Sequence, residues 1–401
     1  MKKFISLSLC ALAVLSAGAQ VATVEQAKKL AGKPDKIAEA RSLIQQALQN
    51  PETANQAQTY YVAGKIEWDA YDKNAAKQLT NPDGVNPIDM SKELLNGYNY
   101  FMQVFPLDEL PNEKGEIKPK YTKELQKKIA DKTNNFWEAG ANFYSEKQYY
   151  PEAYQAFMIF GNMPDQTVLG KQAPLIADTL RAVSFFNAGI SAWAADKVDD
   201  AALAFAKARE NNYQQPEAYI YELACWQNIE QNDSTREQEA VDKIFTAARA
   251  GFDKFGMSQP VFLNNMVNTM INKDKENDAL AIVNDAISAY PDKASLYGLR
   301  GFIYDRMKNE EASEADYRKA AEMPDIDYET MRNAVTKLLR IGQEKWNNIE
   351  LGDPNIKAKK DDVRKNYFEV AKKYAEKART LTDNPDDMDY LIESIDYQLS
   401  L

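Results

Sequence analysis

Large and small apolar residues alternate at fixed intervals along much of the chain. In residues 185–208, the large Phe185 and Phe205 are accompanied by small residues at Gly189, Ala201 and Ala208. Spacings of three and four residues place such side chains on one face of a helix. The pattern predicts a hairpin of two helices, in which the small residues allow close approach and the large ones fill the space between the helices.

Two consecutive 34-residue units, 260–293 and 294–327, repeat this pattern with identical spacing. The matched positions are Leu263, Met266, Val267, Met270, Ala279, Val283, Ala286 and Pro291 in the first unit, and Tyr297, Arg300, Gly301, Tyr304, Ser313, Tyr317, Ala320 and Asp325 in the second. This arrangement resembles the tetratricopeptide repeat. The resemblance to that family, in a secreted bacterial form, implies an all-α fold: a right-handed solenoid of roughly eight helical hairpins.

Less regular units flank this pair. Their core positions include Tyr60, Gly64, Leu94, Phe101, Phe136, Gly140, Phe157, Phe160, Tyr221, Cys225, Ile244, Met331, Leu338, Ala371 and Ala378. Segment 74–89 is rich in turn-forming residues and is expected to be an insertion between two helices, the second of which ends before Pro106. Residues 387–399 are expected to form a capping helix that covers the apolar end of the last repeat.

One continuous solenoid over residues 20–401 is therefore expected. It has irregular repeats in 20–173, more regular repeats in 174–345, an inserted loop at 346–362, and the last helix and cap in 363–401.

The first 19 residues have a different character. Lys2 and Lys3 precede an apolar run from Phe4 to Leu15, and a small-residue cleavage motif ends at Ala19. This order is typical of a secretory signal peptide, and the apolar run is far shorter than the ~20 residues that a membrane-spanning helix needs. We expect cleavage before Gln20 and a mature chain in the periplasm without a transmembrane segment. Secretion and peripheral association with the envelope are the alternatives to a periplasmic location.

Composition narrows the possible chemistry. The chain has no histidine, which excludes His-based metal sites and triads, and no disulfide can form within the mature chain because Cys225 is its only cysteine. The formal net charge of −11 disfavours nucleic acid as a partner. Phosphate-binding and dinucleotide-binding glycine loops are absent from the sequence. We expect neither an enzyme nor a cofactor.

In tetratricopeptide repeats, the first helix of each hairpin lines the concave side, so the resemblance implies a binding groove there. The residue after each core position is rotated by about 100° toward that side. We call these positions the groove register. Its predicted binding residues are Tyr61, Trp68, Trp137, Tyr144, Phe186, Trp193, Tyr219, Trp226, Asn264, Asn268 and Phe302.

A second interpretation of this register stays open, because an aromatic stripe at helical spacing is often core packing between neighbouring repeats. The basic clamp of chaperone-binding relatives is not reproduced in the sequence. The asparagines offer hydrogen-bond donors and acceptors to an extended polypeptide backbone.

Two segments near the C-terminus are rich in charged residues. Residues 357–379 contain nine Lys or Arg and four Asp or Glu. This composition is more typical of a solvated helix with charged pairs than of a lipid-binding patch. Segment 383–390 lacks the glycine and the distal glutamate of a calcium-binding loop, so no metal site is assigned.

Two classes of function remain. The first is a non-enzymatic periplasmic scaffold or adaptor that binds a protein or peptide partner, in envelope assembly or as a chaperone. The second is a glycan-binding protein, because sugars also stack on exposed aromatic rings.

Overall fold

The computed structural model describes residues 22–111, 114–350 and 352–401. The expected signal peptide lies outside these ranges. Every regular element in the described ranges is helical, which confirms the all-α prediction. Contacts divide the chain into two compact units, Met1–Ala240 and Val241–Leu401, and each is described by itself. The expectation of one continuous solenoid stays a prediction.

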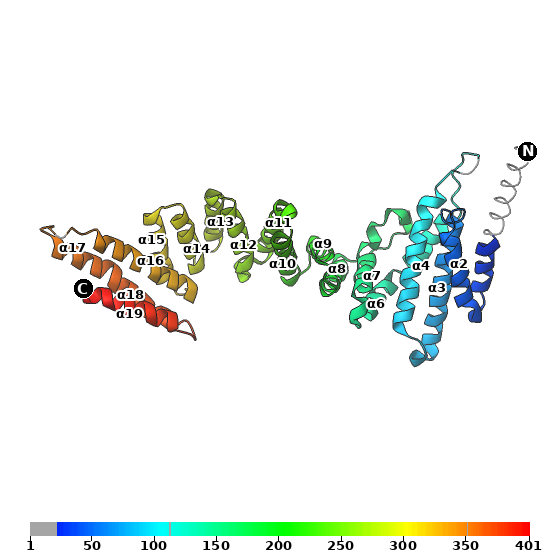
Figure 1. Ribbon diagram of the computed structural model, residues 1–401, viewed down its shortest axis with the longest axis horizontal. Coiled ribbons are helices and arrows are strands. Elements are labelled where there is room, and N and C mark those ends of the chain that lie inside the picture. The colour runs from blue at the N-terminus through cyan, green and yellow to red at the C-terminus, as the bar shows by residue number, and fades with distance from the viewer. Residues whose placement is uncertain (1–21, 112–113, 351) are drawn as a thin grey trace, which may run out of the picture. The chain divides into compact units, whose positions relative to one another are not determined.

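In the first unit, residues 22–31 are helical and each longer helix packs mainly against its neighbours in sequence. The elements that follow are η1 (Pro34–Lys36), α2 (Ile37–Gln49), α3 (Ala57–Thr80), η2 (Pro82–Gly84), α4 (Pro87–Asp108), α5 (Thr122–Asp131), α6 (Thr133–Tyr144), η3 (Lys147–Tyr149), α7 (Tyr150–Asn162), η4 (Met163–Asp165), η5 (Thr167–Gln172), α8 (Asp178–Ala194), α9 (Val198–Glu210), α10 (Glu217–Asn232) and η6 (Ser234–Arg236). Figure 1 shows α3 and α4 side by side as a pair of long helices.

The second unit continues the hairpin pattern. After α11 (Glu237–Phe255), which begins before the boundary, come η7 (Gly256–Ser258), α12 (Pro260–Asn272), α13 (Glu276–Ala289), α14 (Ala294–Arg306), α15 (Glu310–Glu322), α16 (Tyr328–Asn347), α17 (Ile356–Val363), the π-helical η8 (Arg364–Phe368), α18 (Glu369–Arg379) and α19 (Asp386–Ser400). The predicted capping helix is α19, whose Met388 and Ile395 are fully buried.

Close approach of glycine and aromatic residues explains the large-and-small pattern. A Cβ atom added to Gly189 on α8 would lie 2.5 Å from the Phe205 ring of α9. Gly64 faces Phe101 at the same distance, and Gly140 faces Phe157 at 2.7 Å. Because these distances leave no room for a methyl group, the ring of the second helix must lie directly over the glycine of the first.

The turns inside the regular hairpins also repeat. Asp274 and Lys308 follow α12 and α14, lie 34 residues apart and have φ of 53° and 58°. The next residue of each turn, Lys275 or Asn309, donates its backbone N–H to a carbonyl in the last turn of the helix, at 2.9 Å. Left-handed residues with this hydrogen bond end helices by satisfying their free carbonyl groups.

Three local expectations require correction. Residues 74–80 continue α3, so the expected insertion is a turn of only a few residues around η2. Helix α4 passes through Pro106 and ends at Asp108. The expected loop at 346–362 contains most of α17. In the first and third cases the turn-forming residues mark the helix ends, while the neighbouring Ala, Lys, Gln and Leu residues are good helix formers.

Candidate binding groove

The groove register of α3 is covered by α5. The Tyr61 hydroxyl donates to the Glu124 carboxylate at 3.0 Å, and its ring stacks on Tyr121 with centroids 4.2 Å apart. Helix α5 packs in turn against η5, where Gln126 donates to the Val168 carbonyl oxygen. Tyr61 is therefore half-buried beneath a segment that the repeat pattern does not include.

Trp68, one turn further along α3, belongs to the core. Only 3% of its surface is exposed, its Nε1 donates to the Leu94 carbonyl oxygen at 2.9 Å, and its ring meets the Phe101 ring edge-on at 4.8 Å. Because the indole is buried and its polar atom is satisfied, the prediction that Trp68 belongs to an accessible binding face is wrong.

An open groove lies further along the unit, between α6, α7 and α8. It has a volume of about 350 Å³ and is lined by Ala141, Tyr144, Phe157, Phe186, Asn187 and Ile190. Four of these residues, Ala141, Tyr144, Phe186 and Ile190, occupy the groove register of α6 and α8. At these two helices the register faces a shared hollow.

Aromatic rings hold the walls of this groove in place. The Phe186 ring stacks on Tyr213 at 4.6 Å with an interplanar angle of 13°, and Trp137 meets Phe157 and Phe160 edge-on at 5.7 and 5.3 Å. Such pairs fix the orientation of the rings, so the groove needs little rearrangement to accept a ligand.

Two rings of the predicted register remain accessible on α6 and α8. Tyr144, which lines the groove, is 41% exposed and contacts Tyr150. Trp193, three residues after the groove-lining Ile190 on α8, is 42% exposed and lies edge-on to Phe205 and Tyr221. The apolar surface extends toward the start of α8 through the exposed Leu180 and Val183.

Asn187 is a groove residue that the sequence pattern missed. Its backbone carbonyl accepts from the Ser191 hydroxyl at 2.8 Å, whereas its half-buried side-chain amide has no partner among the described residues. The amide offers both a donor and an acceptor inside an otherwise apolar groove. A signal was present in the sequence, because Leu180, Val183, Asn187 and Ile190 follow one another at intervals of three and four residues.

The expected continuation of the face onto α10 is wrong. Tyr219 and Trp226 are buried, and Arg236 lies 5.7 Å from the centre of the Trp226 ring. Glu222, at the same register, is also buried and accepts from Arg209 at 2.7 and 3.1 Å. A buried carboxylate requires such a partner. Residues 219–226 of α10 therefore pack in the core and do not extend the accessible face.

The predicted residues of the second unit lie at its surface. Asn264 and Asn268 are exposed on α12, one turn apart, and Phe302 is 41% exposed on α14. Their role in binding stays a prediction.

Cys225 of α10 is buried. Burial raises the pKa of the Cys225 thiol to about 12, so the reactive thiolate is scarce near neutral pH. Within the described ranges no group of three or more Cys, Asp or Glu side chains is placed to hold a metal ion. In those same ranges, no helix has the length and apolar character required to cross a bilayer.

Charged pairs occupy much of segment 357–379, which agrees with its interpretation as a solvated helix. Arg364 pairs with Asp361 at 2.6 Å, Lys372 with Asp396 at 2.6 Å, and Arg379 with Asp389 at 2.9 Å.

Two-helix hairpins, a 34-residue period in residues 260–327 and a groove between two successive hairpins define a helical-repeat fold similar to that of tetratricopeptide repeats. No family model and no curated protein matches the chain.

Similar solved structures include the TPR2AB domain of yeast Sti1 in a complex with pHSP90, which is 13% identical and covers 69% of this chain and 98% of its own, with a TM-score of 0.25. A monomeric mutant of IFIT1 with Gppp-AAAA is 11% identical; the match covers 86% of this chain and 77% of that chain, with a TM-score of 0.34. The TPR domain of P58(IPK) is 12% identical; the match covers 81% of this chain and 99% of that chain, with a TM-score of 0.23. Because these TM-scores are low, the fold assignment rests on the hairpins of this chain.

Proposed function

We propose that this protein is a non-enzymatic scaffold or adaptor that binds a polypeptide in the groove between α6, α7 and α8. One observation carries the proposal: an accessible hollow of about 350 Å³ combines fixed aromatic walls with the side-chain amide of Asn187. Apolar side chains of a partner would fill the hollow, and the amide would hydrogen-bond to the partner's backbone.

We further propose that the protein acts in the periplasm, in envelope assembly or as a chaperone. The amino-terminal pattern of charged, apolar and small residues supports export. Mass analysis of the protein from a cell envelope fraction should find Gln20 as the first residue. Recovery of a chain that retains Met1 would contradict export by a cleaved signal peptide.

A random peptide library displayed on phage tests the binding proposal. Peptides selected on the wild-type chain should carry a large apolar residue, and a synthetic selected peptide should bind a variant with Ile190→Glu at least about tenfold more weakly, because a carboxylate is costly in an apolar hollow. Leu203→Glu is the matched control, since Leu203 is exposed on α9 and is not among the groove-lining residues.

Equal weakening by both substitutions, or no enriched peptide, would overturn the proposal. A glycan-array signal that Ile190→Glu abolishes, with no peptide enriched, would instead support the alternative function of glycan binding through the exposed rings of Tyr144 and Trp193.

A further inference from the structure

A second cleft lies on another side of α6, against the extended ends of α3 and α4. These two helices have 24 and 22 residues, whereas α12, α14 and α15 have 13 each. The extra turns come from the segment that the sequence pattern marked as an insertion. They create a cleft of about 570 Å³, which we call the lateral cleft; its wall includes Tyr71, Leu79, Met90, Ser91, Glu138 and Asn142.

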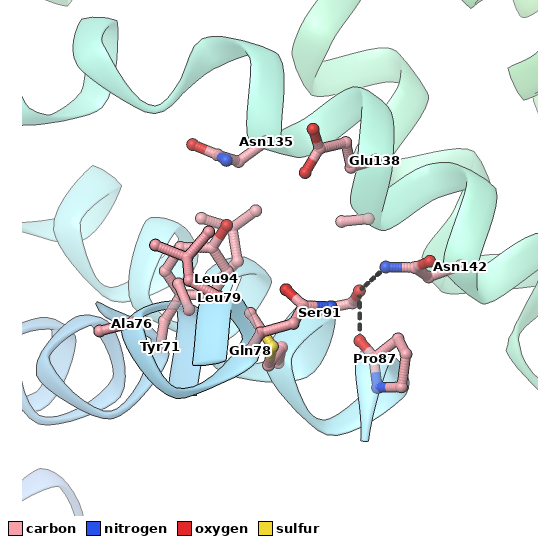
Figure 2. Close-up of a pocket in the computed structure, with 13 residues that line it drawn as sticks. Tyr71, Ala76, Gln78, Leu79, Pro87, Ser91, Leu94, Asn135, Glu138 and Asn142 are labelled. Carbon is pink, nitrogen blue, oxygen red and sulfur yellow. Dashed lines mark hydrogen bonds between the residues drawn. The ribbon is translucent and has the colours of Figure 1, made fainter. Parts of the chain in front are cut away.

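The two sides of the lateral cleft differ in chemistry. Figure 2 shows Asn135 and Glu138 of α6 on one side, facing Leu79 and Leu94 on the other. Leu79 is exposed, while Met90 and Leu94 form the buried floor. The cleft therefore offers an apolar surface beneath a polar edge.

The polar edge is rich in hydrogen-bond acceptors. The Ser91 hydroxyl donates to the Pro87 carbonyl oxygen at 2.8 Å and accepts from Asn142 Nδ2 at 3.1 Å (Figure 2). The hydrogen bond to Ser91 holds the Asn142 amide in place, and its side-chain carbonyl oxygen can accept from a ligand. The Glu138 carboxylate adds two more acceptor oxygens.

No cation in the described part of the chain neutralises Glu138. It has no ion pair or hydrogen bond there, and neither Lys nor Arg lines the lateral cleft. The nearby Lys132 pairs with Asp72 and lies 4.7 Å from the centre of the Tyr71 ring. Burial, and then the negative charges of Glu138 and Asp72, raise the pKa of Tyr71 to about 12, in keeping with a negative potential beside the cleft.

We propose that the lateral cleft binds a cationic side chain of a polypeptide partner, with arginine preferred over lysine. The aliphatic stem would lie along Leu79 and Met90, and the guanidinium would donate to the Glu138 carboxylate and the Asn142 carbonyl oxygen. Arginine is preferred because its planar fork can donate two parallel hydrogen bonds to a carboxylate. The acidic chain would also attract a basic partner over a longer range.

A neutral sugar fits the lateral cleft less well. Sugar recognition requires an accessible ring face, but Tyr71 is only 7% exposed and Lys132 already lies over its ring. The assignment of a polypeptide ligand rests on the proposed function, whereas the preference for a cation comes from the cleft itself.

Methyl NMR on the full chain labelled with carbon-13 at its methionine methyl groups tests this inference, because Met90 lines the cleft. Met90→Leu assigns the signal. The probes are a blocked Gly-Arg-Gly peptide and the same peptide with citrulline, a neutral isostere of arginine. We expect the arginine peptide to shift the Met90 signal saturably and the citrulline peptide to bind about tenfold more weakly or not at all.

Glu138→Gln should weaken binding of the arginine peptide by about tenfold. The control Glu109→Gln makes the same charge change at an exposed position outside the cleft and should leave binding unchanged. Tyr144→Ala alters the α6–α8 groove and should also leave it unchanged. If no peptide binds the α6–α8 groove but the arginine peptide still shifts the Met90 signal, only the proposed function is refuted.

Absence of a saturable Met90 shift would overturn the cationic site. So would equal binding of the arginine and citrulline peptides, or equal effects of Glu138→Gln and Glu109→Gln.

Discussion

Helices α3 and α8 carry the same residue types at the same spacing, yet they use them differently. Tyr61, Gly64 and Trp68 on α3 correspond to Phe186, Gly189 and Trp193 on α8. Trp68 is 3% exposed and hydrogen-bonded in the core, whereas Trp193 is 42% exposed, three residues after the groove-lining Ile190. The register thus identifies which residues turn toward one side of a hairpin, but it does not determine whether that side is accessible.

A single residue on the second helix accounts for much of this difference. A Cβ atom at Gly97 of α4 would lie 2.0 Å from Trp68 Cδ1, so the indole occupies space that only glycine leaves open. Gly97 precedes the aromatic core residue Phe101 by four positions, and the matching position before Phe205 on α9 is Ala201. The added segment α5 then covers Tyr61 and completes the burial of this face.

The largest expected effect is a loss of stability when the buried Trp68 between α3 and α4 is removed. Trp68→Ala should lower the free energy of unfolding by about 3 to 5 kcal/mol, because it leaves a cavity in the core and removes the hydrogen bond from the indole to the Leu94 carbonyl oxygen. Denaturant unfolding monitored by circular dichroism measures this. A loss as small as that of an exposed residue would show that Trp68 is not a core residue.

Gly97→Ala should have the next largest effect. The added methyl group collides with the Trp68 ring, so we expect a loss of about 1 to 3 kcal/mol and increased exposure of that tryptophan. Tryptophan fluorescence of the variant should shift to the red. Gly352→Ala is the matched control, since no atom lies within 4 Å of its added Cβ, and it should shift neither stability nor fluorescence.

The cover formed by α5 provides a smaller, pH-dependent test. The Asp108 carboxylate accepts backbone N–H bonds from Lys120, Tyr121 and Thr122 at 2.8 to 2.9 Å, at the start of α5. Burial opposes its charge, but these bonds and the Thr122 hydroxyl hold the pKa of Asp108 below its usual value of 3.8. Asp108→Asn should therefore cost about 1 to 2 kcal/mol at neutral pH.

The sign of the pH dependence follows from the lowered pKa. The stabilising contribution is complete above the usual pKa of an aspartate and is lost as the pH falls through the lower folded value. The difference in stability between the wild type and Asp108→Asn should therefore shrink below about pH 4. A difference that stays constant down to pH 2 would contradict the role of the ionised carboxylate.

The smallest expected effect is at the open groove. Tyr144→Ala should change the free energy of unfolding by no more than about 0.5 kcal/mol, since the ring is 41% exposed. A loss close to that of Trp68→Ala would mean that the groove wall is core packing, and would remove the contrast between the two regions.

The hairpins could be predicted from the sequence because the residues that form each helix–helix contact lie within one repeat. Gly189 and Phe205 each appear at a position that the repeat period specifies, and the period alone shows that they face each other. The burial of Trp68 depends on Gly97. The cover over Tyr61 depends on α5, which lies more than 50 residues further along the chain. The lateral cleft depends on the length of two helices whose ends look like a loop, so none of these features was accessible from the register alone.

The affinity and stability of Tyr144→Ala, compared with Phe205→Ala, test the central claim most directly, because Tyr144 lines the groove and is exposed. For a peptide selected on the wild-type groove, Tyr144→Ala should weaken binding by about tenfold or more while changing the free energy of unfolding by less than about 1 kcal/mol. Phe205→Ala should lower stability by about 3 to 5 kcal/mol and leave the affinity of the folded fraction nearly unchanged. Equal losses of stability in both variants, without a change in affinity, would contradict a binding groove between α6 and α8.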